Sequence, residues 1–161
     1  MISKLHKDRR GQIFLEALFV IPLLFMLFVF IVETGYLMYN WTVINFNTCN
    51  FAVTAATSGQ FTDEIRLRLA DNISKWTVSS QGYSYDIYGT ALPASPADNT
   101  VYIYGTDRST PVQRGSYISV NVNYPWRFKF FLIDSLFNYV TTENKIRING
   151  NASVPSEVFI E

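Results

Sequence analysis

The sequence predicts an α+β protein in which a long N-terminal transmembrane helix extends into a small extracytoplasmic domain with a short antiparallel sheet. Three observations predict it: an apolar run without a charge, helical spacing of apolar residues beyond this run, and alternation of apolar and polar residues in the second half of the chain. We divide the 161 residues into a short basic segment (1–11), the long helix (12–57) and the outer domain (60–161).

The apolar run predicts a membrane span. It reads ALFVIPLLFMLFVFIV from Ala17 to Val32, and extension back to Ile13 gives about twenty residues, which as a helix rise about 30 Å, the thickness of the hydrocarbon core of a bilayer. The alternative is a helix buried in a soluble core, but such a helix normally keeps a polar stripe and this run has none. Pro22 lies inside the span and frees the carbonyl of Leu18, so we expect a kink or a soft joint there.

The first ten residues predict the orientation of the span. They carry four basic residues and one acidic residue, Asp8, for a net charge of +3. By the positive-inside rule this segment stays cytoplasmic and the domain beyond the span lies outside. A cleaved secretory signal peptide is the competing interpretation, but bulky residues such as Tyr36 and Leu37 follow the run where cleavage requires small ones. The basic residues of this topology signal are Lys4, Lys7, Arg9 and Arg10.

Glu16 is the one charge inside the apolar run when this run is extended back to Ile13. A carboxylate within a span is costly unless it is neutralised or paired, and such residues are functional by default. The alternative is that the span begins at Ala17, so that Glu16 lies at the membrane edge and reaches the cytoplasmic headgroups.

The helix is expected to continue beyond the membrane to Thr57, because apolar residues recur at helical spacing as far as Ala55. A helix over residues 12–57 would be about 69 Å long. Its outer half needs a packing partner, and Cys49 on it is expected to be buried, with a disulfide between subunits left open. Tyr36, Tyr39 and Trp41 are expected at the outer membrane interface, where aromatic rings are favoured.

The outer domain is predicted to contain a second helix and several short strands. Thr62 followed by two acids is typical of a helix start, and Ile65, Leu69, Ile73 and Trp76 then share one face, which we expect to pack on the first helix. Alternating residues predict strands over 83–87, 101–103, 116–124 and 145–154, and helical spacing predicts a third short helix over 130–140.

The composition excludes several functions. The one histidine, His6, lies in the basic segment, which leaves the rest of the chain without the commonest general base. The acidic residues do not cluster at metal-ligand spacing, and Gly105 and Gly115 are too far apart for a phosphate-binding loop. After Gly11 the chain has nine basic and twelve acidic residues. This excess of acid does not favour binding to nucleic acid, whose phosphates need basic side chains. Composition leaves Ser–Lys chemistry open, but we predict a protein that is not an enzyme.

The start of the chain resembles a known family. Basic residues precede Gly11, a glutamate follows five positions later at Glu16, and an unbroken apolar stretch comes next. This order resembles the signal of type IV pilins and pseudopilins. The stretch RRGQIFLEALFVIPLLFMLFVFIVETGYLM, with Pro22 inside the span and Gly35 after it, resembles more closely the TadE/TadF-like minor pilins of the tight-adherence system. The specific resemblance covers Arg9 to Met38.

The resemblance implies a structural role. Residues 1–11 would be a prepilin leader, which a prepilin peptidase removes between Gly11 and Gln12 on the cytoplasmic side of the inner membrane. The new α-amine at Gln12 would then be neutralised by Glu16 of an adjacent subunit, a pairing that penalises wrong registers in a low dielectric. Ala17 follows the glutamate where major pilins of this system have an aromatic residue, which favours a minor subunit.

The implied function is to initiate, cap or regulate the assembly of a pilus for adhesion or secretion. The implied partners are the membrane, the major pilin and other minor pilins, the prepilin peptidase and the pilus assembly platform, with no cofactor. The alternative is a membrane-anchored extracytoplasmic binding module, in which the span is only a tether. Gly11→Ala distinguishes the two, because a prepilin would accumulate uncut and a plain anchor would be unaffected.

Overall fold

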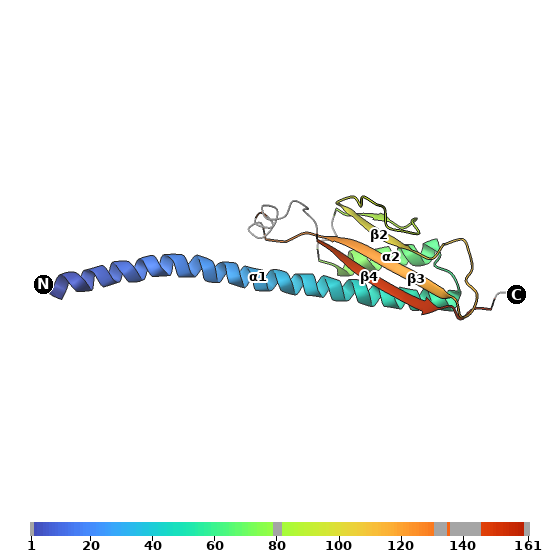
Figure 1. Ribbon diagram of the computed structural model, residues 1–161, viewed down its shortest axis with the longest axis horizontal. Coiled ribbons are helices and arrows are strands. Elements are labelled where there is room, and N and C mark those ends of the chain that lie inside the picture. Colours follow the sequence, from blue (N-terminus) through green and yellow to red (C-terminus); the bar gives the residue numbers. More distant parts are fainter. Residues whose placement is uncertain (1, 79–81, 131–134, 136–145, 160–161) are drawn as a thin grey trace.

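The computed structural model describes residues 2–78, 82–130, 135 and 146–159, with side chains from Gly11 onward. One helix, α1 (Ile2–Ser58), runs through most of the length of the molecule (Figure 1). Its C-terminal half carries a small domain, and its N-terminal half projects from this domain as a stalk. The helix is continuous through Pro22 and bows gently. The kink or soft joint expected at Pro22 stays a prediction.

The long helix ends one residue later than expected, in a Schellman motif. The N–H of Gly59 donates to the carbonyl of Ala56 (3.3 Å), and the N–H of Gln60 donates to the carbonyl of Ala55 (3.1 Å). Gly59 adopts the left-handed conformation that this motif requires, with φ of 71°. The chain therefore turns back sharply, and the next helix runs alongside the first.

The second helix, α2 (Asp63–Trp76), begins at the predicted cap. The Thr62 hydroxyl accepts a hydrogen bond from the N–H of Ile65, and two acids occupy the first turn. The predicted packing face is confirmed for Ile65, Leu69 and Ile73, which are buried. It is wrong for Trp76, which is 61% exposed, because α2 ends there and the following residue, Thr77, turns into the core instead.

The sheet has four strands in the order β1-β2-β3-β4. They are β1 (Ser84–Asp86), β2 (Thr100–Gly105), β3 (Tyr117–Trp126) and β4 (Ile146–Pro155), at the places where alternation predicts strands. The β2–β3 and β3–β4 pairs are antiparallel as expected, but β1 pairs parallel to β2. The reason is the long connection over residues 87–99, which returns the chain to the end of the sheet from which β1 started.

The core lies between one face of the sheet and the two helices. Alternate residues of β3 point into it and are fully buried: Ile118, Val120, Val122 and Tyr124. The edge strand β4 lies directly against α1 (Figure 1), and a Cβ added at Gly150 would be 2.7 Å from Thr48 Oγ1 and 2.9 Å from Ile44 Cγ2. The absence of a side chain at Gly150 thus sets the close approach of β4 to the helix.

The fold class is confirmed: a long apolar N-terminal helix is followed by a small α+β domain. The sheet is mixed rather than wholly antiparallel, because of the parallel β1–β2 pair. The third helix expected over residues 130–140 falls almost wholly outside the described residues.

Candidate assembly surface

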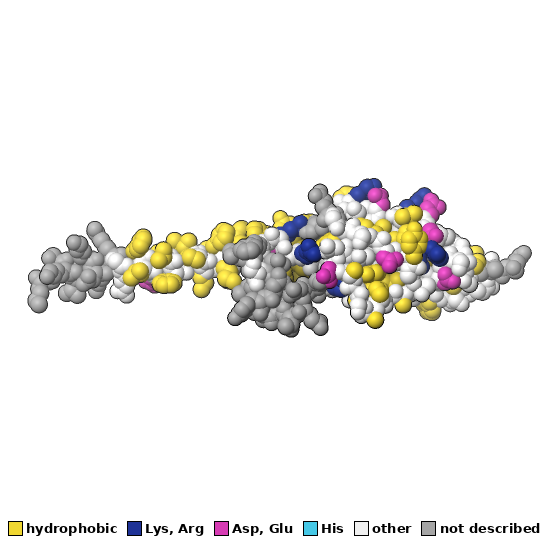
Figure 2. Space-filling view, turned by 90° about the horizontal axis from the view of Figure 1, so that it is seen from above, with side chains coloured by type: hydrophobic (Ala, Val, Ile, Leu, Met, Phe, Trp, Pro, Cys, Tyr) yellow, Lys and Arg dark blue, Asp and Glu magenta, His cyan; other side chains and the backbone are white. Residues whose placement is uncertain are grey.

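The apolar half of α1 has almost no cover from its own chain. Side chains from Gly11 to Val32 are exposed except for Ala17, Val29 and Val32, which are partly or fully buried. Figure 2 shows hydrophobic side chains over the whole visible length of this stalk. Among the described residues, α1 is the one helix that is long and apolar enough to cross a membrane. Its exposed side chains therefore need lipid or other helices around them.

The outer half of α1 is covered on one side only. Phe51 packs against the core as its apolar character requires, but Phe46 and Val53 do not: Met38, Phe46 and Val53 are 63%, 65% and 52% exposed. With Thr42 and Cys49, these residues follow one another at spacings of three and four, and at about 100° per residue they lie within an arc of about 80°. We call these five residues the outer stripe. It lies opposite the buried face that includes Asn40, Ile44 and Thr48.

The outer stripe is continuous with the membrane-spanning half of the helix. Seven earlier residues fall within the same arc of about 80°, again at spacings of three and four. They are Ile13, Ala17, Val20, Leu24, Phe28, Ile31 and Gly35. The apolar face of the outer half therefore continues into the span, which is apolar on every side. Such spacing is typical of a helix that packs against another helix.

The residues predicted from the resemblance lie at one end of this face. Gly11, Gln12 and Glu16 are exposed on the continuous helix, and Glu16 lies about 40° outside the arc at about 100° per residue. The backbone of Lys4, Lys7, Arg9 and Arg10 belongs to the same helix. Gly11, Gln12 and Glu16 thus lie on the stalk, away from the part of the domain that the structure describes.

Cys49 lies on the outer stripe and is exposed. The expectation that it is a buried small residue is therefore wrong. The sequence placed Cys49 on the long helix, but it did not show which face of this helix the domain would cover.

Sequence reasoning did not assign a role to Glu33, the residue directly after the apolar run. Its side chain is 2% exposed, and Oε1 accepts a hydrogen bond from the N–H of Phe130 at 2.6 Å. Oε2 is buried without a hydrogen-bond partner among the described residues. The sequence feature that could have pointed to Glu33 is its position, since it is the one acidic residue between Glu16 and Asp63. Glu33 fixes the chain that leaves β3 at the end of the apolar run.

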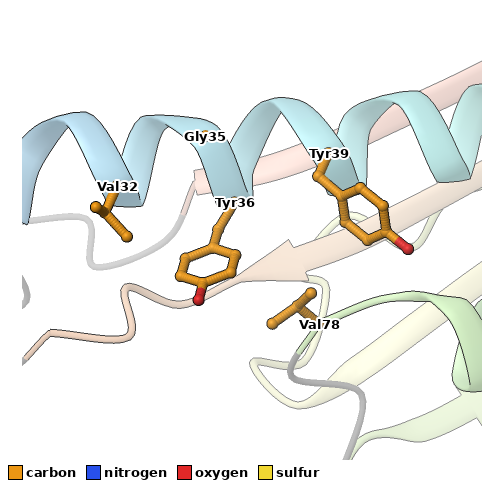
Figure 3. Close-up of a pocket in the computed structure, with 5 residues that line it drawn as sticks. All are labelled: Val32, Gly35, Tyr36, Tyr39 and Val78. Carbon is orange, nitrogen blue, oxygen red and sulfur yellow. The ribbon is translucent and has the colours of Figure 1, made fainter.

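Hydrogen bonds of Asn40 also hold the domain against α1, close to Glu33 along the helix. Asn40 is fully buried and bonds both backbone groups of Val78, just after α2. On the side of this contact that faces the apolar run, a shallow groove of about 400 Å³ opens between α1 and the domain. Tyr36 and Tyr39 point toward Val78 there (Figure 3). A second groove of about 510 Å³ lies between Leu37, Met38 and Trp41 and the start of β4. Both grooves are lined mainly by apolar and aromatic side chains.

A buried arginine holds the loops of the domain together. Arg66 of α2 is fully buried and donates to the carbonyls of Phe61 (3.1 Å), Ile87 (2.6 Å), Gly89 (2.9 Å) and Thr106 (2.8 Å). Burial lowers the pKa of Arg66, but the four carbonyls satisfy the charged form. Its donors are directed to the backbone of the same chain, so Arg66 is a structural residue.

Other titratable groups with shifted pKa values are also explained by their local structure. Burial raises the pKa of Tyr83, Tyr85 and Tyr124, and lowers that of Arg147. Hydrogen bonds from Ser109 and Thr110 lower the pKa of Asp107 at an exposed turn. In the part of the chain that the structure describes, no group of three metal-ligating side chains comes together.

No family model, no curated protein and no solved structure matches this chain.

Proposed function

We propose that the chain is a minor pilin or pseudopilin, similar to TadE/TadF-like proteins. In this proposal a prepilin peptidase cuts it between Gly11 and Gln12, and it then enters a pilus through its long helix. The observation that supports this most strongly is the apolar face that continues from the span along the outer half of α1. A plain membrane anchor needs apolar residues only within the bilayer.

The outer stripe supplies the physical reason. Burying a Met, Phe or Val side chain contributes about 1.5–3 kcal/mol each relative to leaving it in water. Phe46 and Val53 lie beyond the aromatic residues expected at the outer membrane interface and are exposed to water in the isolated chain. Helices of the major pilin or of other minor pilins would cover them and would also replace lipid along the span. Initiation, capping or regulation of fibre assembly is the role that such a subunit would have.

The orientation that we propose places the basic leader in the cytoplasm, the span in the inner membrane and the domain outside. The four basic residues before Gly11 favour this arrangement by the positive-inside rule. After cleavage, Glu16 of one subunit would neutralise the α-amine of Gln12 of its neighbour. The exposure of Glu16 on α1 leaves it accessible to such a neighbour.

The test compares Cys49 in fibres and in free subunits. Pili sheared from cells should contain this chain, and Cys49 should react with a maleimide severalfold more slowly in fibres than in detergent-solubilised subunits. A matched control carries Cys49→Ser and Ser109→Cys, because Ser109 is an exposed residue of the loop after β2 and is not part of the outer stripe. Its thiol should react equally in both states. Equal reactivity of Cys49 in both states, or absence of the chain from fibres, would contradict the proposal and favour an anchored binding module.

A further inference from the structure

Residues 127–130 of the domain lie beside the end of the apolar run of α1. The N–H of Phe130 donates to Glu33 Oε1 at 2.6 Å, and Glu33 directly follows Val32, the last residue of the run. In Figure 1 the chain that leaves β3 runs back along α1 toward the stalk. If the run spans a bilayer, residues 127–130 therefore lie at its outer surface.

The composition of this segment suits a membrane surface. Arg127 and Lys129 are exposed and alternate with two aromatic residues, Phe128 and Phe130, of which Phe130 is also exposed. Aromatic rings favour the headgroup region, and basic side chains are attracted to anionic lipid phosphates. Figure 2 shows Lys and Arg side chains where the apolar stalk meets the domain.

Neighbouring elements present further aromatic residues close to this level. Tyr36 lies about 6 Å along the helix from Val32, and Trp41 about 14 Å, at about 1.5 Å per residue. Both are exposed, as is Trp76 at the end of α2, which the Asn40–Val78 contact holds near the same part of α1. Glu33, an acid at this level, is buried and so does not face the lipid phosphates.

We propose that residues 127–130 dock on the outer leaflet of the membrane, with Phe130 among the headgroups and with Arg127 and Lys129 against the phosphates of anionic phospholipids. Asn99 accepts a hydrogen bond from the Arg127 guanidinium and thereby orients it. This contact would hold the domain upright on the bilayer before the subunit leaves the membrane. It rests on the orientation proposed above and adds the lipid as a direct partner of the domain.

The experiment measures the depth of a fluorescent label in the full chain, reconstituted in nanodiscs. In a Cys49→Ser background, an environment-sensitive dye is placed by Lys129→Cys, by Ser109→Cys at the far end of the domain, or by Phe25→Cys within the span. In discs with one part phosphatidylglycerol to two parts phosphatidylcholine, quenching by aqueous iodide should be severalfold weaker at positions 129 and 25 than at position 109. Protection at position 129 should fall in pure phosphatidylcholine, and also when Arg127→Gln removes the remaining charge.

Each outcome separates the docking from the span. Equal quenching at positions 129 and 109, with position 25 protected, would overturn the docking and leave the span intact. Strong quenching at position 25 would remove the span, and the docking with it. Protection at position 129 that does not depend on phosphatidylglycerol or on Arg127 would overturn the role of anionic lipid.

Discussion

The side chain of Asn40 and the backbone of Val78 form a closed pair of hydrogen bonds, 38 positions apart in the chain. Asn40 Nδ2 donates to the Val78 carbonyl at 3.2 Å, and the Val78 N–H donates to Asn40 Oδ1 at 2.8 Å. Asn40 is fully buried, so its amide is removed from water as the domain packs on α1. The pair couples folding of the domain to the helix that carries it.

We expect Asn40→Ala to lower the free energy of unfolding by about 2–3 kcal/mol, because both backbone groups of Val78 lose their partner where they are partly buried. Urea unfolding in detergent micelles, followed by near-UV circular dichroism, measures the change. Asn45→Ala is the matched control, since Asn45 donates to the Trp41 carbonyl of its own helix. This substitution should change stability by about 0.5 kcal/mol or less. Equal effects of the two substitutions would contradict the coupling.

Phe46→Asp should abolish incorporation into fibres without unfolding the subunit. Phe46 is exposed in the isolated chain, so its loss should change the free energy of unfolding by about 0.5 kcal/mol or less. In a helix–helix contact, the new carboxylate would be buried without a partner. Immunoblots of sheared pili measure incorporation. Leu67→Asp, at an exposed apolar residue of α2 away from the outer stripe, should assemble normally, and a normal level of Phe46→Asp in fibres would remove the stripe from the account.

Stability should fall at high pH because of buried tyrosines. Burial raises the pKa of Tyr124 above its ordinary value of about 10, so above that pH the unfolded state loses a proton that the folded state keeps. The contribution is fully present below pH 10 and is lost as the pH rises further, at up to about 1.4 kcal/mol per pH unit. In Tyr124→Phe the slope of the unfolding free energy between about pH 10.5 and 12 should be shallower by about this amount. An unchanged slope would show that Tyr124 does not cause the loss of stability at high pH.

Glu16→Ala should permit cleavage of the leader and impair incorporation into fibres severalfold, because the α-amine of the neighbouring subunit would lose its partner in a low dielectric. The ratio of the chain in sheared fibres to the chain in membranes measures this. Glu64→Ala, which removes an exposed acid of α2, serves as the control. Normal piliation with Glu16→Ala would remove the role assigned to the glutamate.

Periodicity predicted which residues share a face, and this prediction is confirmed for β3 and for α2 except at Trp76. The alternation from Ile118 to Tyr124 marks the buried side of β3, and the cap at Thr62 marks the start of α2. Periodicity cannot show which face another element will cover. Phe51 is half-buried while Phe46 and Cys49 are exposed, because β4 and α2 pack on one side of α1 only.

The remaining differences depend on contacts between distant parts of the chain. An arginine such as Arg66 is normally expected in solvent, and its burial follows from four carbonyls that loops bring around it. The parallel pairing of β1 depends on the path of a long loop. Of the candidate site, motif resemblance supplied Gly11, Gln12 and Glu16, whereas the outer stripe and Glu33 required the packed domain.

The most direct test of the central claim is the intact mass of the chain, purified from membranes of cells that contain an active prepilin peptidase. We expect a mature chain that begins at Gln12, and a full-length precursor when Gly11→Ala is introduced. Retention of residues 1–11 in the unaltered chain, with the same peptidase cleaving a known prepilin in the same cells, would contradict this claim.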